Sequence, residues 1–513
     1  MDRRQAIFFG ISAVAALATS VGATNLKPKA DGSKDDAPAK PFSYDSLLKI
    51  AQETAKTPYV ERRAELPDQY QDLTAARYHE IMFRSEASSW NANASQFSLK
   101  ALPCGFLYET PVDIHIVERG LATPLMVDGP AFASPTKTGS ENPDQVALPY
   151  SGLSLSGPFP GIEEPQPIVT FQGASYFKAL APGQVFGSTA RGLAIKTAHP
   201  DGEEIPVFRE YWIELPSNDA DAVTIYALLD SVSTTGAYRF TLRPDQSTLV
   251  EVDMTLFPRD DIKFVGIAPL SSMFLFDEKN HRDFDDDRPA AHNADGLAML
   301  NGMSEWIWRP LSNPNRLQIS AFADNSPKGF GLIQRKRKFE DFTDTNSQFQ
   351  KRPSCWIEPV GNWGKGQVQL IEIPSKHEFH DNIAVFWRPA EALQQGKPLR
   401  LAYKMHWGGD PIRPQQLATI ASTRVGRGTS ENRRRYTVMF ERQTPFSKPV
   451  QVDTWASRGT LSAVTGTLHP TNKNIYIVSM ELDPEGARLS ELRIALRDEK
   501  QAVSEVWLHR WIS

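Results

Sequence analysis

Cysteine is almost absent, because the 513 residues include only Cys104 and Cys355. Two cysteines exclude a disulfide framework and permit one disulfide at most, and their strand-like surroundings favour two buried free thiols instead. An excess of positive charge is missing too. The formal net charge is −5 at pH 7 and no basic stripe is visible, which argues against nucleic acid as a partner.

Long apolar runs are confined to the first residues, and no later stretch could cross a bilayer. Residues 1–23 are typical of an export signal, since Arg3 and Arg4 precede an apolar run from Ile7 to Val21 and small residues come just before Thr24. Paired arginines favour the twin-arginine route, and a membrane anchor is the alternative. Residues 24–42 are rich in Lys, Asp, Ala and Pro, so we expect a disordered lead.

Helical periodicity is scarce, and only Asp45–Thr57 and Leu73–Phe83 predict helices. From about Phe97 onward, alternating runs and Gly or Pro turns recur roughly every eight to fifteen residues, which predicts a mainly β protein. A Gly- and Pro-bounded segment at residues 394–397 indicates a domain boundary. We therefore expect a large β-sandwich domain over residues 43–393 and an immunoglobulin-like domain over residues 398–513, with Leu399–Trp407 as its first strand.

Complete motifs for nucleotides, nucleophilic serine and metals are lacking. Gly152–Ser156 misses the last glycine of a nucleophile elbow, and Trp363–Gly366 is too short for a P-loop. His377–Asp381 contains metal-ligand residue types, but on an extended chain they point to opposite sides. The alternating aspartates of residues 283–287 lack the glycine of a calcium loop. We expect no metal and no other cofactor.

Aromatic residues are plentiful, and the stretch Ser304–Pro389 carries several tryptophans on short strand-like runs beside carboxylates. Flat aromatic faces next to polar groups suit sugar rings, whose faces are apolar and whose rims are not. Each tryptophan taken alone could instead fill a β-sandwich core. As a group they favour a carbohydrate cleft.

Carboxylates supply the chemistry that remains. The loop Phe276–Asp295 is long and acidic for a strand-rich domain, which is typical of a functional loop, although a solvated loop is the alternative. Glycoside hydrolysis needs an acid that protonates the leaving oxygen and a base that activates water. Asp381 ends a strand beside Phe386 and Trp387, where an apolar wall would raise its pKa, and the acidic loop could supply the base.

Several short motifs resemble those of a known family, the periplasmic glucan biosynthesis proteins G and D, over nearly all of the mature chain. Twin-arginine export makes the chain look closest to protein D. The motifs, besides Ser304–Pro389, are Gly173–Phe177, Ala190–Ile195, Tyr226–Ser231, Thr235–Phe240 and Gly266–Pro269.

The resemblance implies a large N-terminal β-sandwich similar to galactose-mutarotase domains and a C-terminal immunoglobulin-like sandwich. It also implies a periplasmic role in shaping the β-1,2-linked backbone of osmoregulated periplasmic glucans, as an inverting glycoside hydrolase or transglycosylase. The general acid would be Asp381, in the motif Asp381–Ala384. The alternative is a non-catalytic glucan-binding or scaffold protein. The expected partners are β-1,2-glucan and the inner-membrane glucan synthase that would supply it.

The chain departs from the glucanase pattern at the base. As we align them, glucanases carry Asp where this chain has Asn293, in the run His292–Leu297. An amide cannot accept a proton from water at neutral pH. Asp295 or a carboxylate of residues 285–287 would then serve instead, or a sugar hydroxyl replaces water, or the protein only binds glucan. The predicted catalytic positions are Asp381, Asn293 and Asp295, and the predicted glucan-binding residues are Trp306, Trp308, Arg352, Trp363, Glu378 and Trp387.

Export by the twin-arginine route depends on the two arginines themselves rather than on their charge. Replacing Arg3 and Arg4 by lysine should leave uncleaved precursor in the cytoplasm, measured by fractionation and immunoblotting. Unimpaired processing of this variant would instead assign the protein to the general secretory pathway.

Overall fold

The computed structural model describes residues 39–85, 88, 90, 95–134, 144–499 and 501–513, so the predicted export signal lies outside the described residues. The lead predicted for residues 24–42 also lies outside them up to residue 38, but its end is ordered. Lys40–Pro41 form a short strand, and the Phe42 ring stacks on Trp212 at 4.9 Å between centroids. The lead was therefore predicted to extend too far.

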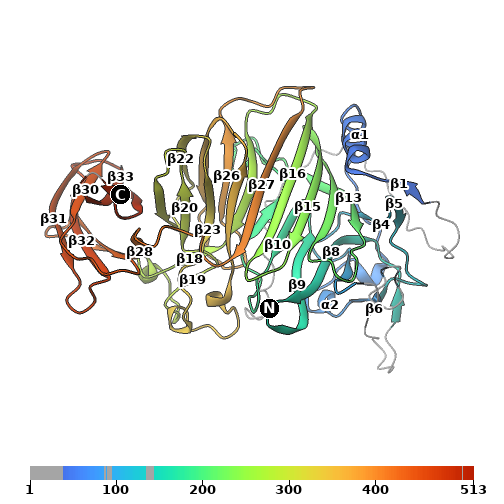
Figure 1. The fold of residues 1–513 in the computed structure, drawn as a ribbon, viewed down its shortest axis with the longest axis horizontal. Helices are drawn as coiled ribbons and strands as arrows, with labels where there is room; N and C mark the ends of the chain where they lie inside the picture. Colours follow the sequence, from blue (N-terminus) through green and yellow to red (C-terminus); the bar gives the residue numbers. More distant parts are fainter. Residues whose placement is uncertain (1–38, 86–87, 89, 91–94, 135–143, 500) are drawn as a thin grey trace.

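The expected mainly β fold is confirmed, and two large sheets dominate the described residues (Figure 1). The sixteen-stranded sheet has the order β1 (Lys40–Pro41), β5 (Leu121–Pro124), β4 (Asp113–Glu118), β13 (Val207–Glu214), β14 (Val223–Asp230), β15 (Thr234–Arg243), β16 (Thr248–Pro258), β27 (Leu399–Gly408), β24 (Ser354–Val360), β23 (Gly329–Ile333), β20 (Gly296–Leu300), β21 (Trp306–Pro310), β35 (Val506–Ile512), β33 (Leu489–Asp498) and β30 (Gln451–Ala456), with β34 (Gln501–Ala502) beside β33.

The ten-stranded sheet packs against part of the first one. Its order is β22 (Gln318–Asn325), β25 (Lys365–Glu372), β26 (Ile383–Pro389), β17 (Val265–Ser272), β11 (Thr189–Arg191), β10 (Tyr176–Ala179), β9 (Ile162–Gln172), β8 (Tyr150–Phe159) and β3 (Ser98–Pro103), with β12 (Ala194–Ile195) beside β17. The largest hydrophobic core contains Val252 and Met405 from the first sheet and Val169 and Val385 from the second, so the core lies between the two sheets.

Smaller elements complete the fold. A four-stranded sheet contains β28 (Thr419–Arg427), β29 (Arg434–Glu441), β32 (Ile475–Asp483) and β31 (Thr460–Leu468). A three-stranded sheet contains β2 (Met82–Phe83), β6 (Phe132–Ser134) and β7 (Asp144–Val146). A two-stranded sheet pairs β18 (Phe274–Phe276) with β19 (Ala291–His292). The helices are α1 (Tyr44–Thr54) and α2 (Ala75–His79), with 3₁₀ turns at Asp68–Tyr70, His281–Asp283, Phe339–Asp341 and Phe349–Lys351. Both predicted helices exist, although the second covers less than half of Leu73–Phe83. No helix of the described residues is long and apolar enough to span a membrane.

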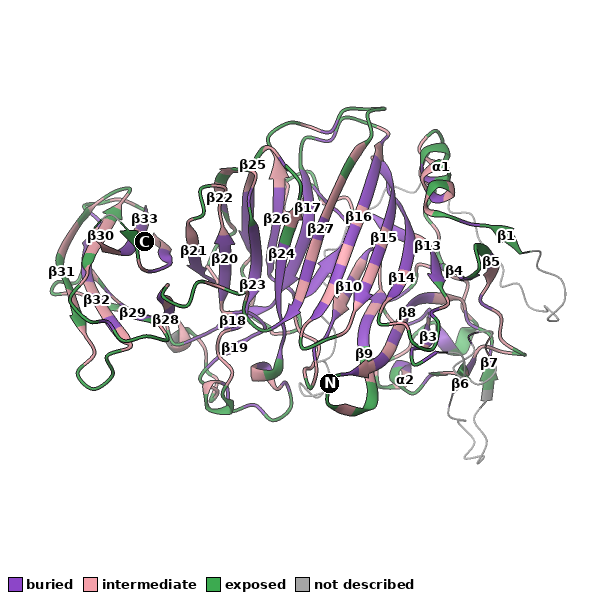
Figure 2. Cartoon of the chain, viewed as in Figure 1, coloured by how far each residue is buried: buried purple, intermediate pink, exposed green. Residues whose placement is uncertain are grey.

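Strand β26 shows how the core decides which side chains face outward. Ile383, Val385 and Trp387 alternate along it and lie in the core between the sheets, whereas Ala384 and Phe386 belong to a separate small cluster on the opposite face. Figure 2 shows buried and partly exposed residues alternating along β16 of the large sheet. One strand therefore serves the core and an outer face.

The predicted domain boundary was wrong. Leu399–Gly408 is β27, which pairs with β16 and β24 in the middle of the large sheet, although it was assigned to the C-terminal domain. A Gly- and Pro-rich loop looks the same whether it joins domains or two strands of one sheet, because pairing with remote strands leaves no local signal. The C-terminal sandwich begins at β28, and a core with residues from β29, β32 and β33 holds its two sheets together.

The C-terminal sandwich is attached to the rest through buried charges. Glu505, which is fully buried, accepts hydrogen bonds from Arg335 at 2.7 Å and from the Ile420 backbone N–H at 3.1 Å, and it pairs with Arg413 at 2.8 Å. The Arg335 guanidinium also lies 3.6 Å from the centre of the Trp308 ring. The two cysteines lie apart as buried free thiols, as expected.

Removing the charge of Glu505 should test this attachment. Glu505→Gln leaves two guanidinium groups without their buried carboxylate, so we expect a loss of about 3–5 kcal/mol in the free energy of unfolding, measured by urea denaturation. Glu431→Gln, at an exposed position of the same domain, is the control. Equal stability of the two variants would contradict a structural role for Glu505.

Candidate functional site

Asp381 lies just before β26, on the outer face of the ten-stranded sheet. Its Oδ2 accepts a hydrogen bond from the Thr189 hydroxyl of β11 at 3.0 Å, and the residue is 7% exposed. Burial raises the pKa of its carboxyl, against the opposing effects of the Thr189 hydrogen bond and the nearby cations Arg191, Lys178 and His380. A buried carboxyl that keeps its proton at higher pH is suited to donate it.

Side chains of four neighbouring strands form a row around this carboxyl. The row consists of Lys178 on β10, Thr189 on β11, Ser271 on β17 and Ala384 on β26. Thr189 lies opposite Ser271, and Ser271 lies opposite Ala384. Because Phe177 pairs with Ala190, the next residue of β10, Lys178, lies beside Thr189. Burial and the neighbouring Arg352 lower the pKa of Lys178 to about 8, while Asp381 opposes that shift. The row is polar at Lys178, Thr189 and Ser271.

Asn293 is brought to the same region through the strand pair β18–β19. Its backbone N–H donates to the Met273 carbonyl at 2.8 Å. The next residue, Phe274, is held by the Asn382 side chain, which accepts from its N–H at 2.8 Å and donates to its carbonyl at 2.9 Å. Asn382 directly follows Asp381, so these contacts set Asn293 and Asp381 on segments that both adjoin Met273–Phe274.

Asp295, the third predicted catalytic position, carries structural bonds. Its Oδ2 accepts from the backbone N–H groups of Arg335 and Lys336, the second at 3.0 Å. Its Oδ1 lies 3.6 Å from His292 Nε2, and burial keeps the pKa of that imidazole far below its ordinary value. The carboxylate therefore ties the start of β20 to the chain that follows β23.

Glu378 and Arg352 lie in a cluster organised by Arg288. The Arg288 guanidinium binds both carboxylate oxygens of Asp286 and reaches Asp344 and Glu378, each at 2.8 Å. Arg352 donates to the Ser347 carbonyl at 2.7 Å, and burial lowers its pKa to about 10. The structure thus brings Glu378 and Arg352 together, and the acidic loop contributes Asp286 as a partner of Arg288.

The predicted aromatic wall does not form. Trp363 and Trp387 lie in the core between the sheets, where their rings contact each other at 6.4 Å. Trp308 is buried against the C-terminal sandwich. Trp306 is half-buried, with its ring stacked on Trp356 at 5.4 Å and Arg413 over it. These four residues are therefore corrected from sugar-binding to packing positions, because other side chains cover their rings.

Analysis of single sequence motifs did not identify three residues that shape the site. Thr189 and Lys178 hold or adjoin Asp381, and Arg288 organises the charged cluster. A signal existed for two of them, since Lys178 follows Gly173–Phe177 directly and Thr189 precedes Ala190–Ile195. Among the described residues, no group of three His, Cys, Asp or Glu side chains is placed to hold a metal ion.

Comparisons with known proteins agree along almost the whole chain. Residues 42–511 match the family model described as "Periplasmic glucan biosynthesis protein, MdoG". "Glucans biosynthesis protein G" of Vibrio cholerae serotype O1 is 40% identical over 474 residues, which are 92% of this chain and 87% of that protein. "Glucans biosynthesis protein G 2" of Shewanella oneidensis is 39% identical over 514 residues, 100% of this chain and 96% of the relative. A closer likeness to protein D stays a prediction.

The buried Asp381 should lower the stability of the protein at neutral pH. A carboxyl whose pKa is raised by folding binds its proton more tightly in the folded state, so stability falls as pH rises from about the ordinary value of 3.8 through the raised pKa and stays reduced above it. Asp381→Asn is neutral at every pH. We expect it to melt at a higher temperature than the unmodified protein at pH 7, with the difference shrinking toward pH 4.

Melting curves at several pH values would check this expectation. Asp221→Asn, at an exposed position, is the matched control. A difference for Asp381→Asn that does not depend on pH would show that burial of the charge is not its cause.

Proposed function

The chain belongs to the family of periplasmic glucan biosynthesis proteins, and we propose that it acts as an enzyme on a β-1,2-linked glucan. Its place in periplasmic glucan biosynthesis follows from the family. The proposal concerns the chemistry: inverting cleavage of the glucan backbone with Asp381 as general acid, and transfer to water or to a sugar hydroxyl. We further propose export by the twin-arginine route and supply of the glucan by the inner-membrane synthase.

The environment of Asp381 is the observation that carries this proposal. The carboxyl is buried, its pKa is raised, and a neutral hydroxyl, that of Thr189, holds one of its oxygens. A general acid must keep its proton until the glycosidic C–O bond breaks and then release it to the departing oxygen. Lys178 and Arg191 lie near enough to stabilise the carboxylate that remains.

Asn293 favours transfer to a sugar hydroxyl over hydrolysis. Its amide cannot accept a proton from water. Of the carboxylates considered as substitutes, Asp295 accepts two backbone hydrogen bonds and Asp286 is held by both of its oxygens on Arg288. Both are engaged in structural contacts, and the other two candidates, Asp285 and Asp287, are exposed to solvent. The contacts of Asp295 and Asp286 support a transglycosylase that lengthens or closes glucan chains. A non-catalytic glucan-binding role is the second candidate, and Asn293 is the observation that favours it.

Incubation of the purified protein with linear β-1,2-glucan, followed by mass spectrometry, separates these functions. Lengthened or cyclic products indicate transfer, shorter chains indicate hydrolysis, and unchanged glucan indicates binding alone. Asp381→Asn should lower turnover by about two to four orders of magnitude, since it keeps the shape of the side chain but cannot donate the proton of an acid. Turnover within a few-fold of the unmodified protein would remove Asp381 from the mechanism.

Asn293→Asp is the informative companion variant. It places a carboxylate where glucanase relatives carry one, so the share of hydrolysis products should increase relative to transfer products. No increase would mean that Asn293 does not limit the reaction with water.

A further inference from the structure

Glu203 forms a largely buried ion pair with Arg191, a residue on the same strand as the hydrogen-bond partner of Asp381. Its Oε1 accepts from the Arg191 guanidinium at 2.7 Å and from the Thr197 hydroxyl at 2.6 Å. We propose that Glu203 is a positioning residue for the general acid, because it holds Arg191 in place and offsets its charge, so that Asp381 stays protonated until it donates. This inference rests on the proposed function, since it takes Asp381 as the acid.

Strand β11 places Arg191 beside Asp381. Ala190 lies in the core between the sheets, so Thr189 and Arg191, on either side of it, point to the outer face. Thr189 donates to Asp381, and alternate residues of a strand are about 7 Å apart. The charge of Arg191 therefore acts on the Asp381 carboxyl, and it is one of the charges that oppose the raised pKa of that carboxyl.

Two groups fix the Arg191 guanidinium. It pairs with Glu203, and it lies 4.6 Å from the centre of the ring of Tyr176, its cross-strand neighbour on β10. Only 8% of the Arg191 side chain and 13% of the Glu203 side chain are exposed, so water screens the pair less than it would on the surface. The guanidinium is thus held in one position relative to Asp381.

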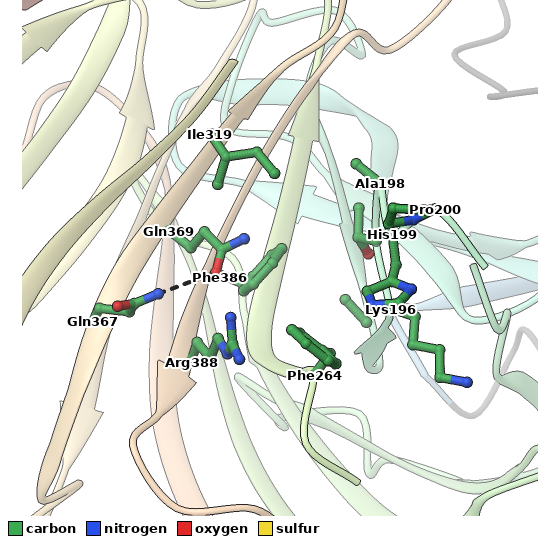
Figure 3. Close-up of a pocket in the computed structure, with 12 residues that line it drawn as sticks. Lys196, Ala198, His199, Pro200, Phe264, Ile319, Gln367, Gln369, Phe386 and Arg388 are labelled. Atoms are coloured by element: carbon green, nitrogen blue, oxygen red, sulfur yellow. Dashed lines mark hydrogen bonds between the residues drawn. The ribbon is translucent and has the colours of Figure 1, made fainter. Parts of the chain in front are cut away.

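The loop that carries Glu203 is anchored at both ends. It begins at Lys196, whose backbone N–H donates to the Phe264 carbonyl at 2.8 Å, and it ends at Glu204, whose N–H donates to the last carbonyl of β12 at 3.1 Å. Figure 3 shows the first residues of this loop on one side of a hollow of about 190 Å³, opposite β26. Thr197 belongs to these residues, so its hydroxyl meets Glu203 within a fixed loop.

The charges around Asp381 explain why Arg191 needs a partner. Groups that can carry positive charge reach Asp381 from three segments, namely Arg191 on β11, Lys178 on β10 and His380 next to it in the chain. Each of them favours the ionised carboxylate, which cannot donate a proton. Among the residues that the structure describes, Arg191 is the one of these three that pairs with a carboxylate. Glu203 therefore weakens the pull of one cation on the proton of Asp381.

Exchange of the carboxylate for an amide tests this inference. Glu203→Gln keeps the size and the acceptor oxygen of the side chain but removes its charge. The basic limb of turnover against pH, where Asp381 loses its proton, should shift to lower pH by about one unit, the effect of one charge at this range. Turnover at the optimum should stay within a few-fold. Glu203→Asp keeps the charge and should leave the limb in place, as should the control Glu164→Gln at an exposed position of β9.

A variant of the partner completes the cycle. Arg191→Met removes the cation and leaves the carboxylate, so the limb should shift to higher pH. Adding Glu203→Gln to Arg191→Met should return the limb toward its original place. This pair measures the effect of the Glu203 charge in a background that has no unpaired buried cation, so it applies even where Glu203→Gln alone fails to fold.

A second readout does not depend on turnover. Folding raises the pKa of Asp381 above 3.8, so its stabilising effect is lost as pH rises through that interval, and Asp381→Asn should melt at a higher temperature at pH 7. In a Glu203→Gln background the pKa lies closer to 3.8, so this advantage of Asp381→Asn should be smaller. In an Arg191→Met background it should be larger.

Three results would overturn the role of Glu203. They are an unshifted limb, an equal melting advantage in all backgrounds, and loss of turnover at every pH in folded Glu203→Gln, which would make Glu203 a proton acceptor in the reaction. Turnover by the unmodified protein decides the proposed function separately. If the unmodified protein turns over no glucan, the melting curves still decide whether Glu203 acts on Asp381.

Discussion

The side-chain amide of Asn382 holds together the segments that make the candidate site. It accepts from the Phe274 N–H at 2.8 Å and donates to the carbonyls of Phe274 and Ile373 at 2.9 and 3.0 Å. Buried backbone groups left without such partners would destabilise the fold, so this geometry is strongly favoured. Asp381 directly precedes Asn382, and Asn293 directly follows β19, the strand that pairs with β18. The buried amide of Asn382 therefore positions both Asp381 and Asn293.

Charges around the site are arranged so that the buried carboxyl of Asp381 differs from its acidic neighbours. Asp286 and Glu378 share Arg288, Asp277 pairs with Lys279, and Glu278 pairs with Lys336. An adjacent cation favours the ionised form of a carboxyl, whereas burial favours the protonated form. At Asp381 the effect of burial outweighs the opposing effects of the Thr189 hydrogen bond and the nearby cations. Three carboxylates of the loop that looks highly acidic in the sequence are thus paired with cations, which are Lys279 and Arg288 of the loop and Lys336 outside it. The raised pKa belongs to Asp381.

The sequence predicted the mainly β fold, because the alternation of side chains along a strand is a local property. It mispredicted the tryptophans, since composition alone does not say which face of a strand packs: Trp387 points into the core while Phe386 beside it points outward. The boundary at residue 398 failed for another reason. Strand β27 pairs with β16, which is more than a hundred residues away in the sequence, and with β24, which is about forty residues away. No local sequence pattern indicates which remote strands will pair.

Strand β26 has one face in the core and one face toward the candidate site. Its inward side chains, Val385 and Trp387, fix the strand between the sheets, and its outward side chains, Ala384 and Phe386, extend the surface that begins at Asp381. A large buried ring is rigid and densely packed, so it holds the backbone of the strand in one place. Trp387, which was predicted to line a sugar-binding wall, therefore acts in the core, where it fixes the backbone of the strand that follows the acid.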